Sequence, residues 1–418
     1  MKKYTKKFLF VIFIFSLGFI VSSLINKSNN IYEEQEQKQI KKHVDTISMM
    51  LETEANSGNY EMTTRESWPT EGYVFNSELS KCENGGELSW DDANKKVLML
   101  GNTSDKCYVY FDKVLTLSTY VKSQYTGVQG ENSIYYHNGT IASDDGTIID
   151  ANDSSYRYAG ASENVNNFVC FGSDVIPCPT DNLYRIIGVF GDKVKLIKYD
   201  YANSNLFGID GDSSSSTFSK SSYSTYKGEL TTINRYYWNY KAINSATNTW
   251  STSLLNKTNL NTNYLNNIGT TWANMIENTT WKVSGNTSFD VIPSVMYTAE
   301  ITNVTKTYEL NDETSKVGLM YASDYGFAAA PSAWTTALGN YDNLLVTAVN
   351  WMYMGLTEWT ISPYIHGISN DIFILNNSGF LYITSASTAF VARPVLYLKT
   401  SVVYVEGSGT QSDPIRIN

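Results

Sequence analysis

The stretch Tyr184-Arg185-Ile186-Ile187-Gly188-Val189-Phe190-Gly191-Asp192-Lys193-Val194-Lys195-Leu196-Ile197 holds two runs of strand-forming residues on either side of a Gly-Asp pair. Valine, isoleucine and aromatic residues favour extended backbone, and glycine next to aspartate favours a two-residue turn. We therefore predict a β-hairpin with strands over residues 184–190 and 193–197. It is the strongest hairpin signal in the chain.

Further secondary structure is predicted on both sides of this hairpin. Val114–Gln124 and Trp250–Ile276 predict short helices, with Ser253 as an N-cap in the second region. Together with the strands, they predict an α+β domain over residues 114–418, with a mostly antiparallel sheet and short peripheral helices. The strand-like runs after the second helical region are Val317–Tyr321, Trp359–Ile361, Ile372–Leu375, Phe380–Ile383, Val391–Leu398 and Val402–Val405.

A smaller group of strand-forming runs precedes this domain, over residues 73–75, 97–100 and 107–111. Glycine-containing turns at Gly85-Gly86 and Gly101-Asn102 separate them. This pattern predicts a small antiparallel β module over residues 59–113. Because about fifty residues make a marginal hydrophobic core, we expect a disulfide to stabilise the module.

The N-terminus predicts a membrane segment. Lys2, Lys3, Lys6 and Lys7 precede Phe8–Ile25, a run without an ionisable side chain. At about 1.5 Å per residue, a helix of this run reaches roughly 27 Å, close to the ~30 Å hydrocarbon core of a bilayer. We therefore interpret residues 1–28 as a single-pass anchor in the plasma membrane, with the C-terminal bulk of the chain extracellular. A cleaved signal and a secreted protein are the alternative.

Residues 29–58 are charged and rich in glutamine at their start. Four apolar residues follow at helical spacing: Ile40, Val44, Ile47 and Leu51. They predict a helical stalk between the membrane and the folded parts.

The four cysteines, Cys82, Cys107, Cys170 and Cys178, suggest disulfides in an extracellular protein. Three connectivities are possible, and we expect neighbours in sequence to pair: Cys82 with Cys107, and Cys170 with Cys178. Neither pair has the C-x-x-C spacing of a zinc site, and the chain has 3 histidines. We therefore predict no metal bound by cysteine and histidine.

The composition argues against nucleic-acid binding. The formal net charge is −10, and no basic patch follows the first seven residues. The chain has 31 tyrosines and 9 tryptophans, along with many serines and asparagines, a mixture typical of recognition surfaces. A bias toward AT-rich codons explains the same composition equally well.

Several short motifs follow one another over residues 180–400. They are the Tyr184–Ile197 hairpin, Trp250 with Ser253 and Leu254, Leu260-Asn261 with Tyr264-Leu265, Val317–Met320, Ser323–Tyr325, Trp359–Pro363 and Arg393–Leu398. In their order and spacing, these motifs resemble a family of uncharacterised surface domains from gut Firmicutes. That family is distantly similar to the C-type-lectin-like fold of formylglycine-generating enzymes. The resemblance implies a fold and a bacterial surface location, without naming a reaction.

One departure from those enzymes is informative. They hold copper through a late pair of cysteines, and this chain has no cysteine after Cys178. The oxidase activity is therefore not carried over.

Catalytic signals in the chain are weak. His366 is the candidate catalytic histidine of the main domain, but no G-x-S-x-G motif accompanies it. A pair drawn from the carboxylates of Glu300, Asp324, Glu358 and Asp371 would support an extracellular hydrolase, which we keep as an alternative function.

No cofactor is expected, although calcium is left open. Asp150-Ala151-Asn152-Asp153 and Asp210-Gly211-Asp212 carry the oxygen ligands that calcium prefers. Neither completes an EF-hand loop, and turns use the same residues for backbone reasons.

We predict a ligand site on two late loops, because long loops on a rigid sheet commonly carry recognition. Flat rings with amide, imidazole and carboxylate groups suit a hydroxyl-rich ligand, either a glycan or a host protein. The predicted function is therefore a surface binding or adhesion protein without catalytic activity, with a structural envelope component as a further alternative. A competing interpretation is that the rings close the core. The site residues are Trp334, Tyr341, Tyr364, His366, Asn370 and Asp371.

Overall fold

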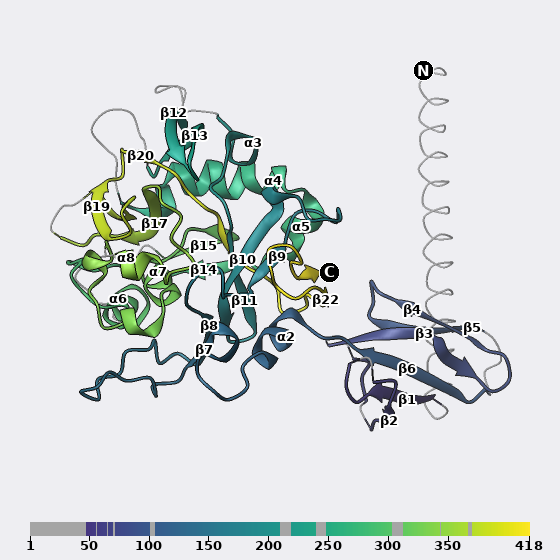
Figure 1. Ribbon diagram of the computed structural model, residues 1–418. Helices are drawn as coiled ribbons and strands as arrows, with labels where there is room; N and C mark the ends of the chain where they lie inside the picture. Colours follow the sequence, from purple (N-terminus) through teal and green to yellow (C-terminus); the bar gives the residue numbers. More distant parts are fainter. Residues whose placement is uncertain are drawn as a thin grey trace, which may run out of the picture. The chain divides into compact units, whose positions relative to one another are not determined.

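The computed structural model describes residues 47–55, 57–64, 66–69, 72–100, 105–209, 219–239, 248–302, 312–342, 344–366 and 370–418 (Figure 1). The chain divides into two compact units, Met1–Val114 and Leu115–Asn418. The described secondary structure is α+β, with mostly antiparallel sheets and short helices, as the sequence predicts.

The predicted membrane segment, residues 1–28, lies outside the described residues. Within the part that the structure describes, we find no helix with the length and apolar character needed to cross a bilayer.

The first unit is built on a sheet with the strand order β2-β1-β6-β3. Cys82 and Cys107 lie opposite each other on β3 and β6, and a disulfide joins them as predicted. Met49 of β1 and Val109 and Phe111 of β6 form the buried core of this unit. The strands are β1 (Ile47–Glu52), β2 (Tyr60–Met62), β3 (Tyr73–Cys82) and β6 (Cys107–Lys113), with a separate hairpin of β4 (Glu87–Asp91) and β5 (Lys96–Leu100).

The helical stalk predicted for residues 29–58 is wrong at its C-terminal end. Residues 47–52 form β1, which pairs in parallel with β6. Ile47, Met49 and Leu51 alternate along the strand and pack in the core of the unit. A short apolar run fits a helical and a strand period equally well, and pairing with β6 decides between them. Residues 29–46 of the predicted stalk lie outside the described residues.

The second unit contains the predicted hairpin at the centre of its main sheet (Figure 1). β10 (Leu183–Phe190) and β11 (Lys193–Lys198) are joined at Gly191, whose φ is 62°. Gly188 lies where the neighbouring strand comes close, because a Cβ there would meet the backbone oxygen of Tyr156 at 2.3 Å. The sheet order is β16 (Val317–Gly318), β21 (Val395–Tyr397), β11, β10, β8 (Ser155–Tyr158) and β7 (Ile134–His137), and β9 (Phe168–Cys170) also pairs with β10.

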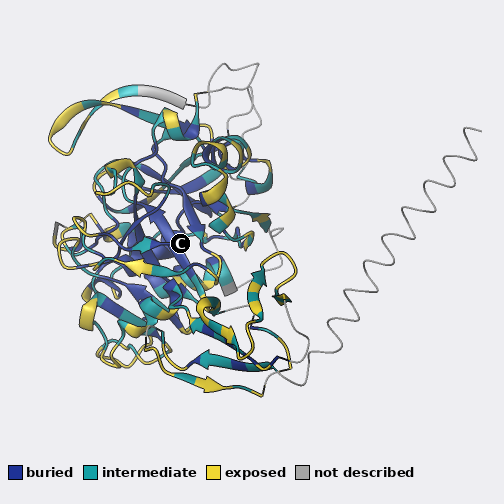
Figure 2. Ribbon diagram, turned by 90° about the vertical axis from the view of Figure 1, so that its right-hand side faces the viewer, coloured by how far each residue is buried: buried dark blue, intermediate teal, exposed yellow. Residues whose placement is uncertain are grey.

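Smaller antiparallel sheets and short helices surround this main sheet. Trp250, Trp272, Trp281 and Trp359 all lie in the hydrophobic core. Figure 2 shows how the buried residues gather inside the unit. The smaller sheets are β12 (Ser219–Tyr226) with β13 (Glu229–Tyr237) and β20 (Ala389–Phe390); β14 (Thr279–Trp281) with β15 (Glu313–Ser315); β17 (Glu358–Pro363) with β18 (Asp371–Leu375) and β19 (Leu381–Ser385); and β22 (Tyr404–Glu406) with β23 (Arg416–Ile417).

The short helices include both predicted helical regions. The hydroxyl of Ser253 accepts the N–H of Asn256 at 3.3 Å, in the manner of an N-cap. The helices are α2 (Leu117–Ser123), η1 (Glu131–Ser133), η2 (Thr180–Asn182), α3 (Ser204–Phe207), η3 (Trp250–Thr252), η4 (Leu255–Tyr264), α4 (Leu265–Asn267), α5 (Thr270–Met275), α6 (Pro293–Tyr297), η5 (Thr298–Thr302), α7 (Ala322–Ala328), η6 (Pro331–Ala333), η7 (Leu338–Asn340) and α8 (Leu344–Thr347).

The strand predicted for Val317–Tyr321 is shorter in the structure and ends at Gly318. Helix α7 follows it, because carboxylates satisfy the free N–H groups at its start. Asp324 accepts the N–H of Tyr321 at 2.9 Å, and Glu300 accepts the N–H of Ala322 at 2.9 Å.

Candidate functional site

The structure divides the six predicted site residues into two groups. Trp334 and Tyr341 have no exposed surface, so the prediction that they face a ligand is wrong. The Trp334 indole donates to the oxygen of Ala329 at 2.8 Å, and the Tyr341 hydroxyl donates to the oxygen of Ala333 at 3.0 Å. The short helices η6 and η7 turn both rings inward, where they close the core.

The other four residues lie together at the end of the β17–β18 hairpin. Tyr364 follows β17, and its N–H donates to the oxygen of Asp371 at 3.0 Å. Tyr364 and Asp371 are half-buried, whereas the side chains of His366 and Asn370 are exposed. The ring centroids of Tyr364 and His366 are 6.0 Å apart. We call these four residues the hairpin-end surface.

A third segment of the chain fixes the backbone of the hairpin-end surface. The N–H of Ile365 donates to the oxygen of Asn286 at 2.9 Å. Gly285 lies directly against β17, because a Cβ there would meet the oxygen of Pro363 at 1.7 Å. The ring of Tyr364 packs edge-on against Phe373 at a centroid distance of 5.6 Å. These contacts fix the backbone of the hairpin end, and the side chains of His366 and Asn370 are exposed to solvent.

Aromatic residues that the sequence analysis did not select lie on or beside the same three-stranded sheet. Tyr382, in β19, is 47% exposed and contacts the rings of Phe289 and Phe380. The alternation of strand side chains could have indicated Tyr382, because its neighbour Leu381 is buried. No comparable signal in the sequence marks Phe289.

The carboxylates considered for hydrolysis are mostly buried and paired. Asp324 lies 2.5 Å from the Lys195 ammonium. Glu358 accepts two hydrogen bonds from the Arg393 guanidinium, at 2.7 and 2.8 Å. This buried ion pair gives Arg393 a structural role.

Glu300 is buried without an ion-pair partner among the described residues. Its carboxylate accepts hydrogen bonds from the N–H groups of Ala322 and Ser323 and from the hydroxyl of Ser362. Burial raises the pKa of Glu300 to about 7, although the hydrogen bonds from Ser323 and Ser362 act to lower it. Burial also raises the pKa of Glu358, despite the opposing charge of Arg393.

The predicted calcium ligands at Asp150 and Asp153 already have donors. Asp150 accepts backbone N–H groups of Gly139, Thr140 and Ile141 at 3.0–3.2 Å. Asp153 lies 2.6 Å from the Arg157 guanidinium. Among the residues that the structure describes, no group of three or more His, Cys, Asp or Glu side chains could hold a metal. The second calcium candidate, residues 210–212, lies outside them.

Comparisons of the chain with protein-family models, curated protein sequences and solved structures found no match.

Proposed function

We propose that the protein is a non-catalytic binding or adhesion protein of the bacterial surface, with a C-type-lectin-like domain that recognises a glycan. The observation that carries the proposal is the hairpin-end surface. There, a tyrosine ring, an imidazole, an amide and a carboxylate lie on either side of the connection of one braced hairpin. Sugars offer hydroxyl groups to amides and carboxylates, and apolar C–H faces to aromatic rings.

Most of the acidic residues considered for catalysis are buried, which supports binding over hydrolysis. Glycoside hydrolysis commonly needs two carboxylates about 5–9.5 Å apart that both reach the substrate. Glu300 and Glu358, whose pKa values are raised, are both buried. Asp324 is buried beside Lys195. Of the four carboxylates considered, Asp371 alone is only half-buried.

The proposed location outside the cell has two supports. The lysine-rich start and apolar run of residues 1–28 are typical of an anchor or a signal segment. Disulfides join all the cysteines of the chain, and disulfides persist mainly in oxidising compartments.

The test is a saccharide-binding screen with the full-length chain in detergent, using an array of monosaccharides and short oligosaccharides. We expect the wild-type chain to bind at least one saccharide, and His366→Ala and Asn370→Ala to weaken that binding at least tenfold. Both side chains are exposed, so the melting temperature should stay unchanged.

Tyr223→Ala is the matched control, because Tyr223 is 75% exposed on a different hairpin. Saccharide binding that falls equally in Tyr223→Ala, or a wild-type chain that binds no saccharide on the array, would refute the proposal.

A further inference from the structure

Val175 and Ile176 are the only two consecutive large hydrophobic residues that are exposed in the described part of the chain, at 60% and 76%. They lie between Cys170 and Cys178, and the adjacent Asp174 and Pro177 are also exposed. We call residues 174–177 the loop apex. Single exposed hydrophobic residues are ordinary on protein surfaces, whereas adjoining ones form an apolar patch of the kind that interaction sites use.

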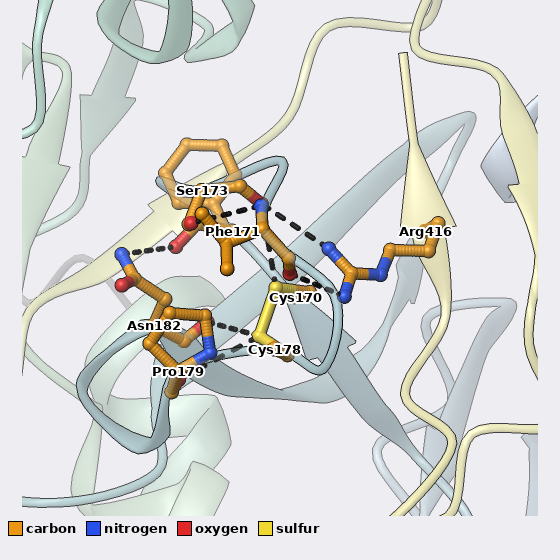
Figure 3. Close-up of a disulfide and its surroundings, with 8 residues drawn as sticks. Cys170, Phe171, Ser173, Cys178, Pro179, Asn182 and Arg416 are labelled. Carbon is orange, nitrogen blue, oxygen red and sulfur yellow. Dashed lines mark hydrogen bonds between the residues drawn. A yellow bond between two sulfur atoms is a disulfide. The ribbon is translucent and has the colours of Figure 1, made fainter.

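The loop that carries the apex is braced at its base and along its backbone (Figure 3). A disulfide joins Cys170 to Cys178. The Arg416 guanidinium, from β23, donates to the oxygen of Ser173 at 3.3 Å and to the oxygen of Val175 at 2.7 Å. These contacts engage the loop's backbone oxygens and leave the apex side chains free.

The base of the loop is part of the folded core. Cys170 is buried at the end of β9, and its N–H donates to the oxygen of Ile415 at 2.9 Å. Just beyond, the N–H of Phe171 donates to the oxygen of Asn182 at 2.9 Å. A loop held in one conformation loses little conformational entropy when it binds, so its apolar side chains can act as a preformed anchor.

The charges around the apex indicate what it binds. Asp174 precedes the apolar pair, and Asp181 follows the loop; both are exposed and make no ion pair among the described residues. The nearby cation, Arg416, has its guanidinium against the loop backbone. These acidic residues repel an anionic lipid surface and attract basic side chains on a protein, so the charges favour a protein partner.

We propose that the loop apex docks into an apolar pocket, bordered by basic side chains, on a partner protein. Val175 and Ile176 fill the pocket, and Asp174 meets its basic rim. The loop follows β9, whereas the hairpin-end surface follows β17; Figure 1 shows these strands in different parts of the unit. This docking surface is therefore independent of the proposed saccharide site.

The test begins with photo-crosslinking on cells that make the full chain. Ile176 is replaced by p-benzoylphenylalanine, and the matched control carries the same photo-reactive amino acid at Val128, which is 60% exposed. We expect a protein to be crosslinked from position 176 and not from position 128. That protein is then purified and its binding to the full chain is measured.

For the purified partner, Ile176→Ser should weaken binding at least tenfold, and Val128→Ser should change it less than twofold. Asp174→Asn should slow association severalfold at low salt and reduce its salt dependence. Non-reducing mass spectrometry would verify that the variants keep the Cys170–Cys178 bridge. The proposal is overturned if position 176 crosslinks only to lipid or to a second copy of the chain, or if it crosslinks no protein that position 128 does not also crosslink. It is also overturned if the purified partner binds Ile176→Ser as tightly as the wild type.

Discussion

Two segments of the second unit, Trp334–Tyr341 and Tyr364–Asp371, look alike in sequence but differ in the structure. Both follow predicted strands and both combine aromatic rings with polar residues. In the first segment the rings are fully buried, and in the second the side chains of His366 and Asn370 are exposed. The difference comes from the surrounding chain. Short helices pack closely around the first segment, because the residues at Ala328-Ala329-Ala330 and Ala333 are small. The second segment joins two paired strands at the end of a sheet.

The largest effect that tests this contrast is expected for Trp334→Ala. The ring is fully buried among Phe327 and His137, so its removal leaves a cavity and an unpaired oxygen on Ala329. We expect the free energy of unfolding to fall by about 3–5 kcal/mol. Urea denaturation measures it, and a loss below about 1 kcal/mol would mean that the segment is not part of the core.

The second effect concerns the strand that carries the exposed segment. Glu358 starts β17, and its carboxylate is the ion-pair partner of the buried Arg393. Glu358→Gln leaves that guanidinium charge without a counter-charge, and we expect a loss of about 3 kcal/mol. Exposed Glu229, in β13, provides the control Glu229→Gln, which should change stability by less than about 0.5 kcal/mol. Equal stability of the two variants would show that the ion pair does not hold the strand.

The third effect is a pH dependence of the free energy of unfolding, which arises from buried ionisable side chains. The pKa of Glu300 is raised from 4.5 to about 7 in the folded chain, mainly by burial. The unfolded chain therefore releases this proton at lower pH, so the stability contribution of Glu300 is present below pH 4.5 and is lost as the pH rises toward 7. His137 acts in the opposite direction, because burial lowers its pKa well below 6.5 and stability falls as the pH falls through that value.

Because these two contributions oppose each other, the test compares variants. The free energy of unfolding of the wild type minus that of Glu300→Gln should decrease by about 2–3 kcal/mol between pH 4.5 and 7.5. Chemical denaturation at a series of pH values measures this difference. A difference that stays constant, or that grows with pH, would show that the carboxyl group of Glu300 is not buried in the folded chain.

The same contrast shows how much of the fold could be predicted from the sequence. The Gly191–Asp192 hairpin and the cysteine pairing follow from local signals, and the structure confirms both. Trp334 is buried because short helices with small side chains pack around it, and this packing exists only in the folded chain. Strand β1 depends on pairing with β6, at residues far along the chain. These features arise from long-range contacts, which spacing within a short segment does not reveal.

For the candidate site, local sequence patterns identified residue types but not their exposure. Tyr364, His366, Asn370 and Asp371 lie together because they flank one hairpin connection, which is a local arrangement. Trp334 and Tyr341 share only their composition with these four residues. The sequence does not mark the loop apex, because a Val-Ile pair near a cysteine has the same composition as a buried strand. Only the structure shows the pair to be exposed.

The smallest expected effect is on stability at the exposed segment. His366 and Asn370 are exposed, and the hydrogen bond that Asn370 makes to Ala386 uses the Asn370 backbone oxygen. Their side chains therefore add little to folding, so His366→Ala and Asn370→Ala should each change the free energy of unfolding by less than about 0.5 kcal/mol. Urea denaturation beside Trp334→Ala gives a direct comparison of the two segments. A loss of more than about 1.5 kcal/mol in either variant would place these side chains in the packed structure, as at Trp334, and would remove the distinction on which the proposed saccharide site depends.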